Sequence, residues 1–278
     1  MEEESIKVSV HMITYNHEKY ISQAIEGVLL QKTDFPIELI ISDDCSTDHT
    51  RDIVSQYAKT NLAIVKPLYR KINLGSMKNF LDTFSYCSGK YIAICEGDDY
   101  WSDPYKLQKQ VDFLESNPDY GMVHTDYNVL IDDGENVTEI PSYHTKTNEI
   151  MPSGNVKNEL IKHNFIATLT VVAKKCFIDE YNRILPIKNI LNYKQGDYPI
   201  WLFIAGLSKI GYLKSSTSLY RVVEGSLSHS SHKKKKIAFL LSEYRIKIVF
   251  LLKYRITDLA LYWQLVKEFP LRLWAQIN

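Results

Sequence analysis

The first half of this chain alternates short apolar runs with amphipathic stretches, and no other feature restricts its fold as strongly. The apolar runs are rich in β-branched residues, as in strands that are buried on both faces of a sheet. The stretches between them place apolar side chains at helical spacing. This alternation predicts βα units, and therefore an α/β fold with a mostly parallel sheet flanked by helices. We predict strands at 7–14, 37–42, 62–66 and 91–95, and helices at 19–31, 46–58, 76–86 and 103–116.

The second half carries weaker signals. Residues 132–151 are polar, turn-rich and unperiodic, which fits either a loop near a site or a surface insertion. The four cysteines are spaced too irregularly for a zinc site or a small disulfide framework, so we expect reduced thiols. Further elements are expected as strands at 121–130, 168–173, 209–213 and 218–223, and as helices at 155–163 and 198–206.

The C-terminal tail differs in charge from the rest of the chain. Basic and acidic residues balance at 33 each overall, but residues 230–278 hold ten basic residues against three acidic ones. A polar, turn-prone segment containing His229 and His232 precedes four consecutive lysines. We interpret both histidines as solvated linker residues and place a boundary there. The chain then divides into a body, residues 1–229, and a basic amphipathic helical tail.

Two helices are predicted within the tail, at 237–253 and 256–267. Lys and Arg interspersed with Leu, Phe, Tyr and Trp suit docking on the body, homodimerisation or contact with an anionic membrane surface. No nucleic-acid-binding motif accompanies the charge. The acidic start lacks the pattern of a secretion signal, and no apolar run is long enough to span a membrane. We expect a cytoplasmic location, with the inner face of the membrane as the alternative.

Acidic residues follow two of the predicted strands. Asp43 and Asp44 end the second strand, and Glu96, Asp98 and Asp99 follow the fourth. Ligands of an open parallel sheet bind beyond the carboxyl ends of its strands. Carboxylates crowded there favour a hard cation such as Mg²⁺ or Mn²⁺, which commonly bridges carboxylates to substrate phosphates. The pattern therefore indicates a nucleoside diphosphate compound, although Asp is also ordinary in turns and helix caps.

Four segments together resemble the inverting glycosyltransferase family 2, whose nucleotide-sugar domain has the GT-A fold. They are VSVHMITYNHEKYISQAIEGVLLQ, IELIISDDCSTDHT, NLGSMKNF and GKYIAICEGDDYWSDPYKLQKQVDFL, in this order. The resemblance implies a nucleotide-sugar-binding half at 1–127 and an acceptor-binding half at 128–229. It further implies a hexosyl- or N-acetylhexosaminyltransferase. Such an enzyme moves a sugar from an NDP-sugar, most commonly a UDP-sugar, to a glycan or lipid-linked acceptor in surface polysaccharide biosynthesis.

The resemblance also assigns the nucleotide to particular positions. Asp43 would accept a hydrogen bond from the base N–H, and Lys78 would contact phosphate. The positions implied near the first three helices are Thr14, Tyr15, Asn16, Asp43, Asp44, Asn73, Gly75 and Lys78.

The acidic motif usually written D-x-D is E-G-D in this chain, followed by a further Asp. The resemblance makes Asp98 the main ligand of Mn²⁺ or Mg²⁺, with Glu96 nearer the ribose. Asp99 would lie behind the metal or face the sugar. Tyr100 and Trp101 would be sugar-facing candidates beside this loop, with aromatic packing beneath the loop as the alternative.

An inverting transferase needs a general base, because the acceptor hydroxyl loses its proton as it attacks the anomeric carbon. The family supplies an acid at a helix start about a hundred residues after the metal motif, which points to Asp197 followed by Pro199. A capping role for Asp197 remains open and compatible. Trp201 is expected in the core. The late segment implies that Arg221 contacts the diphosphate, while Val223 stands where a His would be sought.

Two other functional classes are compatible with parts of this pattern. A sugar nucleotidyltransferase shares a similar nucleotide-binding sheet, but its Gly-rich loop should follow the first strand, where this chain has TYNHEKY. A non-catalytic nucleotide-sugar-binding subunit would keep the donor pocket without turnover. Replacement of Asp197 by asparagine separates this class from an enzyme, because only an enzyme loses transfer while it keeps donor binding.

Overall fold

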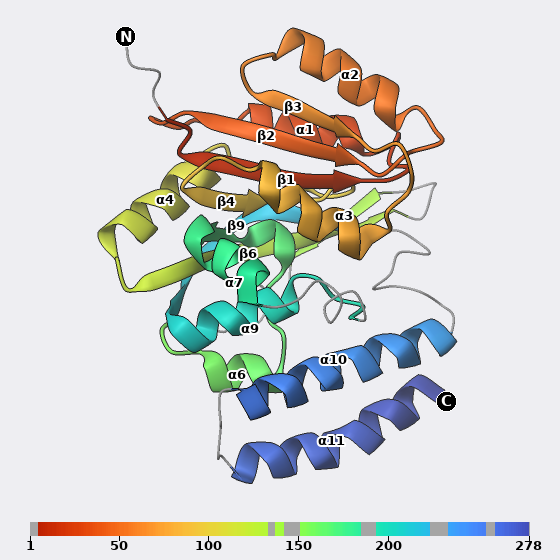
Figure 1. Cartoon of the computed structure of the whole chain (residues 1–278), viewed down its shortest axis with the longest axis vertical. Coiled ribbons are helices and arrows are strands. Elements are labelled where there is room, and N and C mark those ends of the chain that lie inside the picture. The colour runs from red at the N-terminus through yellow and green to blue at the C-terminus, as the bar shows by residue number, and fades with distance from the viewer. Residues whose placement is uncertain are drawn as a thin grey trace.

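The computed structural model describes residues 5–132, 137–141, 151–184, 193–222, 233–253 and 259–277. These segments form one nine-stranded sheet with helices on both faces (Figure 1). The strands are β1 (Val8–Thr14), β2 (Ile37–Asp43), β3 (Val65–Tyr69), β4 (Tyr91–Ile94), β5 (Tyr100–Trp101), β6 (Tyr120–Asp132), β7 (Val137–Pro141), β8 (Val172–Lys174) and β9 (Lys209–Val222). The helices are α1 (Ile21–Leu29), α2 (Thr50–Thr60), α3 (Ser76–Thr83), η1 (Phe84–Tyr86), α4 (Lys106–Ser116), α6 (Lys157–Lys162), η2 (Thr168–Thr170), α7 (Lys175–Ile184), α9 (Tyr198–Leu207), α10 (Lys233–Lys253) and α11 (Leu259–Ile277).

The half of the sheet built first along the chain is parallel. β3, β2, β1 and β4 are neighbours in this order, and all three pairings run parallel. Thr14 at the end of β1 lies opposite Asp43 at the end of β2. The segments that follow β1, β2 and β4 therefore emerge at one edge of the sheet, as the alternating sequence pattern predicts.

The other half of the sheet is mixed. β8 runs antiparallel to both β4 and β6, whereas β9 runs parallel to β6 and antiparallel to β5. β7 forms a hairpin with the end of β6, so part of the polar 132–151 segment is a strand and not a loop. The remaining residues of that segment, 133–136 and 142–150, lie outside the described residues.

Three predicted elements differ from the structure. β9 is one continuous strand and not two. Opposite Thr125–Tyr127 of β6 it carries extra residues, and of the polar residues 214–217 only Ser216 has a partner in this register, so the strand continues through bulges. The predicted strand at 168–173 is a turn of 3₁₀ helix, η2, followed by the short β8. Helix α7 was not expected. Its 3.6-residue periodicity rests on only two buried residues, Ile178 and Tyr181.

Each face of the sheet is covered by its own apolar core. β1 alternates accordingly: Val8, Val10 and Met12 face the core under α1, α2 and α4, while Ile13 faces the core on the other side. Helices α3, α7 and α9 pack on that second side together with α6 (Figure 1). Trp201 of α9 is fully buried there, which confirms its predicted place in the core. All four cysteines lie in described segments and form no disulfide.

The helical tail packs against the body. α10 and α11 lie side by side at the end of the molecule that holds α6, with α11 lowest in this view (Figure 1). Buried Tyr244 and Phe250 of α10 join the core that contains α9. The Lys247 ammonium, fully buried, donates to the Lys162 carbonyl oxygen at 2.9 Å and pairs with Glu243 at 2.7 Å. Docking on the body, one of the three roles expected for the tail, is therefore observed.

Val223, His229 and His232 lie outside the described residues, so their expected roles stay predictions, as does the boundary at residue 229. No described helix is long and apolar enough to cross a membrane.

Candidate functional site

Two adjoining cavities open at the edge of the sheet where β1, β2 and β4 end. We call them the Asp98 cavity, of about 460 Å³, and the Asp197 cavity, of about 490 Å³, after one acidic residue in each. Four residues line both cavities and form the wall between them: Ile13, Ser76, Glu96 and Tyr220. Volumes of this size are typical of pockets that bind small molecules.

Most of the residues assigned to the nucleotide come together in the Asp98 cavity. Its lining includes nine of them: Thr14, Tyr15, Asp44, Asn73, Gly75, Glu96, Asp98, Asp99 and Arg221. Three others, Asn16, Asp43 and Lys78, are not among the described residues that line either cavity.

Asp44 closes the turn that precedes α3. Its two carboxylate oxygens accept hydrogen bonds from the backbone N–H groups of Leu74 at 2.7 Å and Gly75 at 2.9 Å. The Asn73 side chain accepts from the same Gly75 N–H at 3.0 Å. Gly75 has a φ of +81°, a left-handed conformation that a residue with a Cβ rarely adopts. These bonds fix the cavity wall that the sequence expects from Asn73 and Gly75.

Asp43 points away from the cavity. Its carboxylate is fully buried and accepts from Arg51 Nε at 2.8 Å and Nη2 at 2.7 Å. The other carboxylate oxygen accepts from the Ser46 N–H at 3.3 Å. Because consecutive side chains at a strand end point to opposite sides, only Asp44 of the pair reaches the cavity. The contact expected between Asp43 and a nucleobase stays a prediction; in this structure the carboxylate is engaged by Arg51, and Asp43 is not among the described residues that line the cavities.

Asn16 and Lys78 also lie elsewhere. Asn16 has a φ of +55°, and its side-chain oxygen accepts from the Thr47 N–H at 2.8 Å. Its own N–H donates to the Ser46 hydroxyl at 3.0 Å. This residue therefore ties the turn after β1 to the turn after β2. Lys78 is exposed on α3.

The loop after β4 that carries Asp98 is held in place by Arg221 of β9. The Arg221 N–H donates to Asp99 Oδ1 at 2.7 Å, and its Nε donates to the Asp98 carbonyl oxygen at 3.0 Å. Its Nη2 donates to Gln23 Oε1 of α1 at 2.6 Å. The guanidinium also lies over the Tyr20 ring, 4.6 Å from its centroid. Arg221 thus lines the cavity, as expected for a phosphate contact, while its hydrogen bonds serve the acidic loop.

Like charges accumulate on this loop. Burial, together with the neighbouring charges of Asp98 and Asp197, raises the pKa of Glu96 to about 8. Burial, with the charges of Asp98 and Glu96, also raises the pKa of Asp99 well above its usual value. A bound cation would relieve this repulsion.

The residues present fit a divalent cation that is shared with a phosphate ligand. Among the described residues, no group of three or more His, Cys, Asp or Glu side chains forms a cage of its own. A hard cation that takes one carboxylate oxygen from Asp98 and further oxygens from a diphosphate needs no such cage. The Asp98 carboxylate lines the cavity and is available for this role.

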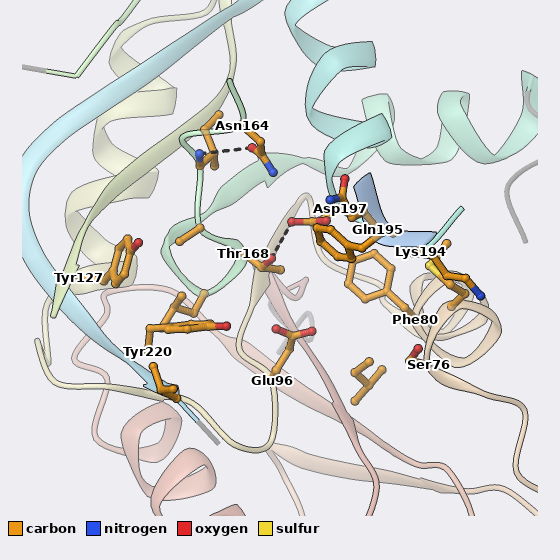
Figure 2. A pocket seen from close by; sticks show the side chains of 18 of the residues that line it. Ser76, Phe80, Glu96, Tyr127, Asn164, Thr168, Lys194, Gln195, Asp197 and Tyr220 are labelled. Carbon is orange, nitrogen blue, oxygen red and sulfur yellow. Dashed lines mark hydrogen bonds between the residues drawn. The ribbon is translucent and has the colours of Figure 1, made fainter. Parts of the chain in front are cut away.

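Asp197 stands at the start of α9, as its sequence position predicts. Its carbonyl oxygen accepts the first helical hydrogen bonds, from Ile200 and Trp201, but its side chain makes no capping hydrogen bond within the described structure. The carboxylate instead accepts from the Thr168 hydroxyl at 2.9 Å (Figure 2). Burial raises the pKa of Asp197, and this hydrogen bond partly offsets the rise.

Figure 2 shows the Asp197 and Glu96 side chains converging on the Asp197 cavity from α9 and from the loop after β4. Tyr127 and Tyr220, from β6 and β9, line another side of the same cavity. Asp197 therefore lines one cavity, Asp44, Asp98 and Asp99 line the other, and Glu96 stands in the shared wall.

The two aromatic residues beside the acidic loop take part in the sheet and its core. Trp101 is buried, and its indole N–H donates to the Leu169 carbonyl oxygen at 2.9 Å. Tyr100 pairs with Leu219 of β9. Neither belongs to the described lining of the cavities. Aromatic packing, the alternative that the sequence left open, is what the structure shows, because β5 joins the edge of the sheet.

Several lining residues were not predicted. His17 has a local signal, since it lies in the same turn as Thr14; its Nδ1 is 3.2 Å from the Thr14 hydroxyl and its Nε2 is 3.9 Å from Asp98 Oδ2. Lys194 and Gln195 lie beside Asp197, and Tyr220 lies beside Arg221, but no role was assigned to them. Tyr127, Asn164 and Thr168 lie outside every motif quoted above.

Comparisons with known proteins agree with this geometry. The model of the family described as glycosyl transferase family 2 matches residues 9–177. An uncharacterized protein of Mycobacterium tuberculosis is 33% identical over 227 residues, which are 81% of this chain and 61% of that protein. The chain thus spans less than two thirds of that relative. The Escherichia coli protein named UDP-Glc:alpha-D-GlcNAc-diphosphoundecaprenol beta-1,3-glucosyltransferase WfgD is 27% identical over 231 residues, 82% of each chain.

Solved structures show the same fold. Staphylococcus aureus TarS, residues 1–349 in complex with UDP-GlcNAc, has a TM-score of 0.69 and 20% identity over 97% of this chain and 73% of that chain. The mannosyltransferase PcManGT of Pyrobaculum calidifontis, in complex with GDP-Man and Mn²⁺, has a TM-score of 0.69 and 15% identity over 99% of this chain and 74% of that chain.

Proposed function

This chain belongs to glycosyltransferase family 2 and has the GT-A fold, and from that premise we propose that it transfers a sugar from an NDP-sugar to an acceptor hydroxyl with inversion. One observation carries the proposal. Asp98 and Asp197 line two adjoining cavities that share the Glu96 wall. Inversion requires the leaving diphosphate and the attacking hydroxyl on opposite faces of the anomeric carbon. A donor in one cavity and an acceptor in the other, meeting at the shared wall, would satisfy this requirement.

The Asp98 cavity is the proposed donor site. Asp44, Asn73 and Gly75 build its wall, and His17 lies near Asp98. We propose a UDP-sugar as donor. The support comes from the name of the E. coli relative, which acts on UDP-Glc, and from TarS, which was solved with UDP-GlcNAc. The type of sugar transferred, a hexose or an N-acetylhexosamine, is proposed on the same ground.

Asp98 would hold Mn²⁺ or Mg²⁺ together with the diphosphate, and the cation would stabilise negative charge on the departing group. Arg221 contributes by holding the Asp98 backbone through its carbonyl oxygen. The Mn²⁺ in the PcManGT structure supports the choice of metal.

Asp197 is the proposed general base. Its carboxylate takes the proton of the acceptor hydroxyl as that oxygen bonds to the anomeric carbon, while the bond to the diphosphate oxygen breaks and its electron pair leaves with the nucleotide. The Thr168 hydroxyl orients the carboxylate through the 2.9 Å hydrogen bond. The raised pKa of Asp197 makes it a stronger base than an exposed aspartate.

We propose a glycan or lipid-linked acceptor, a role in surface polysaccharide biosynthesis and a cytoplasmic location. The E. coli relative is named for a diphosphoundecaprenol-linked acceptor, and a Bacillus subtilis relative is named as a putative teichuronic acid biosynthesis glycosyltransferase. The Asp197 cavity, lined by Tyr127, Tyr220 and Lys194, would receive the acceptor.

Release of nucleoside diphosphate from a panel of UDP-, GDP- and dTDP-sugars tests the proposal, with Mn²⁺, Mg²⁺ or EDTA present. We expect metal-dependent release from one donor. Asp197→Asn should lower the release rate by about 10²–10⁴ while donor binding stays unchanged. Asp52→Asn, on the exposed surface of α2, is the matched control and should behave as wild type.

Two outcomes would contradict this function. Failure of every donor to bind would remove the nucleotide-sugar assignment. Binding of a donor without release, in the presence of candidate acceptors and metal, would instead indicate a non-catalytic binding subunit.

A further inference from the structure

One face of α11 is apolar and exposed along its length. Trp263, Val266, Leu271 and Trp274 are each between 63% and 69% exposed. Their spacing of three, five and three residues places them on one side of a helix. Leu265, on the opposite side, is buried against α10 and the body. The exposed face is therefore not the one that folds the tail onto the protein.

α10 presents a similar face. Leu241, Ile248 and Leu252 are 49%, 53% and 67% exposed, and they recur at intervals of seven and four residues. Buried Ile246 and Phe250 occupy the other side and pack into the core. Large exposed apolar side chains gathered on neighbouring helices are uncommon on soluble proteins and mark interaction surfaces.

The exposed charges on the described part of these helices have one sign. Among their described side chains, every one that is both exposed and charged is basic. Glu243 is buried, where it pairs with Lys247 at 2.7 Å and accepts two hydrogen bonds from Arg272 at 2.8 and 3.0 Å. The exposed basic residues are Lys233, Lys234, Lys235, Lys236, Arg245, Lys253 and Lys267.

We propose that the outward faces of α10 and α11 bind an anionic lipid surface, on which both helices lie. Amphipathic helices with Trp and Leu on the buried face and Lys or Arg around it bind at the boundary of headgroups and acyl chains. Trp is enriched at that boundary. A second copy of this face would bring like charges together, whereas anionic headgroups complement them.

Helix α10, which carries part of the proposed surface, adjoins the Asp197 cavity through its inward side. Phe239 of α10 lines that cavity, and Ser242 accepts the Lys194 N–H at 2.8 Å, just before Asp197. The Arg245 guanidinium lies over the Tyr193 ring at 6.0 Å. If the proposed function holds, the surface therefore places the acceptor cavity beside the lipid from which a lipid-linked acceptor would arrive.

Flotation of the full chain with vesicles tests the surface without any substrate. We expect binding to phosphatidylcholine vesicles that contain phosphatidylglycerol, and weaker binding to phosphatidylcholine alone. Raising NaCl from about 0.1 M to about 1 M should weaken it, because the screening length falls from about 10 Å to about 3 Å. The combined substitution Trp263→Ser, Trp274→Ser should lower the partition coefficient at least about tenfold, and Lys267→Glu should lower it on its own.

Matched controls lie on the far side of the molecule. Leu62→Ser removes a side chain that is 80% exposed, and Lys59→Glu reverses an exposed charge on α2; both should bind as wild type. Thermal unfolding of each variant checks folding, and Lys267→Glu keeps the test valid if the tryptophan variant does not fold.

Two results would overturn the proposed lipid-binding surface. One is vesicle binding that the tryptophan and Lys267 substitutions leave unchanged, and the other is wild-type protein that does not bind anionic vesicles. Wild-type dimers in solution that these substitutions dissociate would assign the face to a second copy. Donor hydrolysis without vesicles should be unchanged in all variants. If the wild-type protein hydrolyses no donor but still binds vesicles, and the substitutions weaken that binding, the proposed function is rejected and the lipid-binding surface is supported.

Discussion

Replacing Arg221 with lysine tests whether this side chain holds the acidic loop. The guanidinium donates to the Asp98 carbonyl oxygen at 3.0 Å and to Gln23 at 2.6 Å, and the residue is only 6% exposed. Lysine keeps the charge, but its single ammonium cannot reproduce the rigid fork that reaches two acceptors. The backbone bond from residue 221 to Asp99 is kept in any variant.

The size of the effect follows from these contacts. A hydrogen bond from a charged donor contributes about 1.5–3 kcal/mol, and Arg221→Lys loses at least one of the two. We expect a loss of about 2 kcal/mol. At about 2–4 °C per kcal/mol for a domain of this size, the midpoint of thermal unfolding should fall by about 4–8 °C. Arg221→Ala loses both bonds and the cation facing buried Asp99, so its loss should be larger, about 4 kcal/mol.

Thermal unfolding of the protein without donor or metal is the assay, because any contact with a diphosphate is then absent. Arg183→Lys is the matched control. Arg183 pairs with Glu180 on the exposed surface of α7, and exposed ion pairs contribute only about 0–1 kcal/mol. An Arg221→Lys protein that unfolds at the wild-type temperature and differs only in donor affinity would refute the anchoring role and favour a direct phosphate contact.

Two further predictions concern the neighbouring residues. Because the pKa of Asp197 is raised by burial, and a base must be ionised, the release rate should fall as pH drops through that raised pKa. Thr168→Val removes the hydrogen bond that lowers this pKa, so the acidic limb of the pH–rate profile should move to higher pH. An acidic limb at the wild-type pH would show that ionisation of Asp197 does not set it. Gly97→Ala should destabilise the protein by about 1–3 kcal/mol, since its Cβ would lie 2.7 Å from the Thr14 hydroxyl oxygen and 2.9 Å from His17 Nδ1; thermal unfolding equal to that of wild type would contradict this packing.

The parallel half of the sheet was predictable because its signals are local. A buried strand and an amphipathic helix each reveal themselves within about 15 residues. The acids after β2 and β4 were therefore predicted at the correct edge of the sheet. Pro199 marked the start of α9, with Asp197 directly before the helix. The second half gave weaker signals, because its pairings are mixed and β9 keeps polar residues in a strand through bulges.

Sequence alone thus determined the α/β architecture, the family and the positions of Asp98 and Asp197, since periodicity, turns and motif order are properties of neighbouring residues. Only the tertiary structure decided which side chains face the cavities. Arg51 draws the Asp43 carboxylate inward and leaves Asp44 on the wall. Asp197 and Glu96 line the same cavity although about a hundred residues separate them in sequence, because η2 packs against β4 and Thr168 of η2 holds the Asp197 carboxylate. Such contacts form between residues that are far apart in the sequence, so no local sequence pattern predicts them.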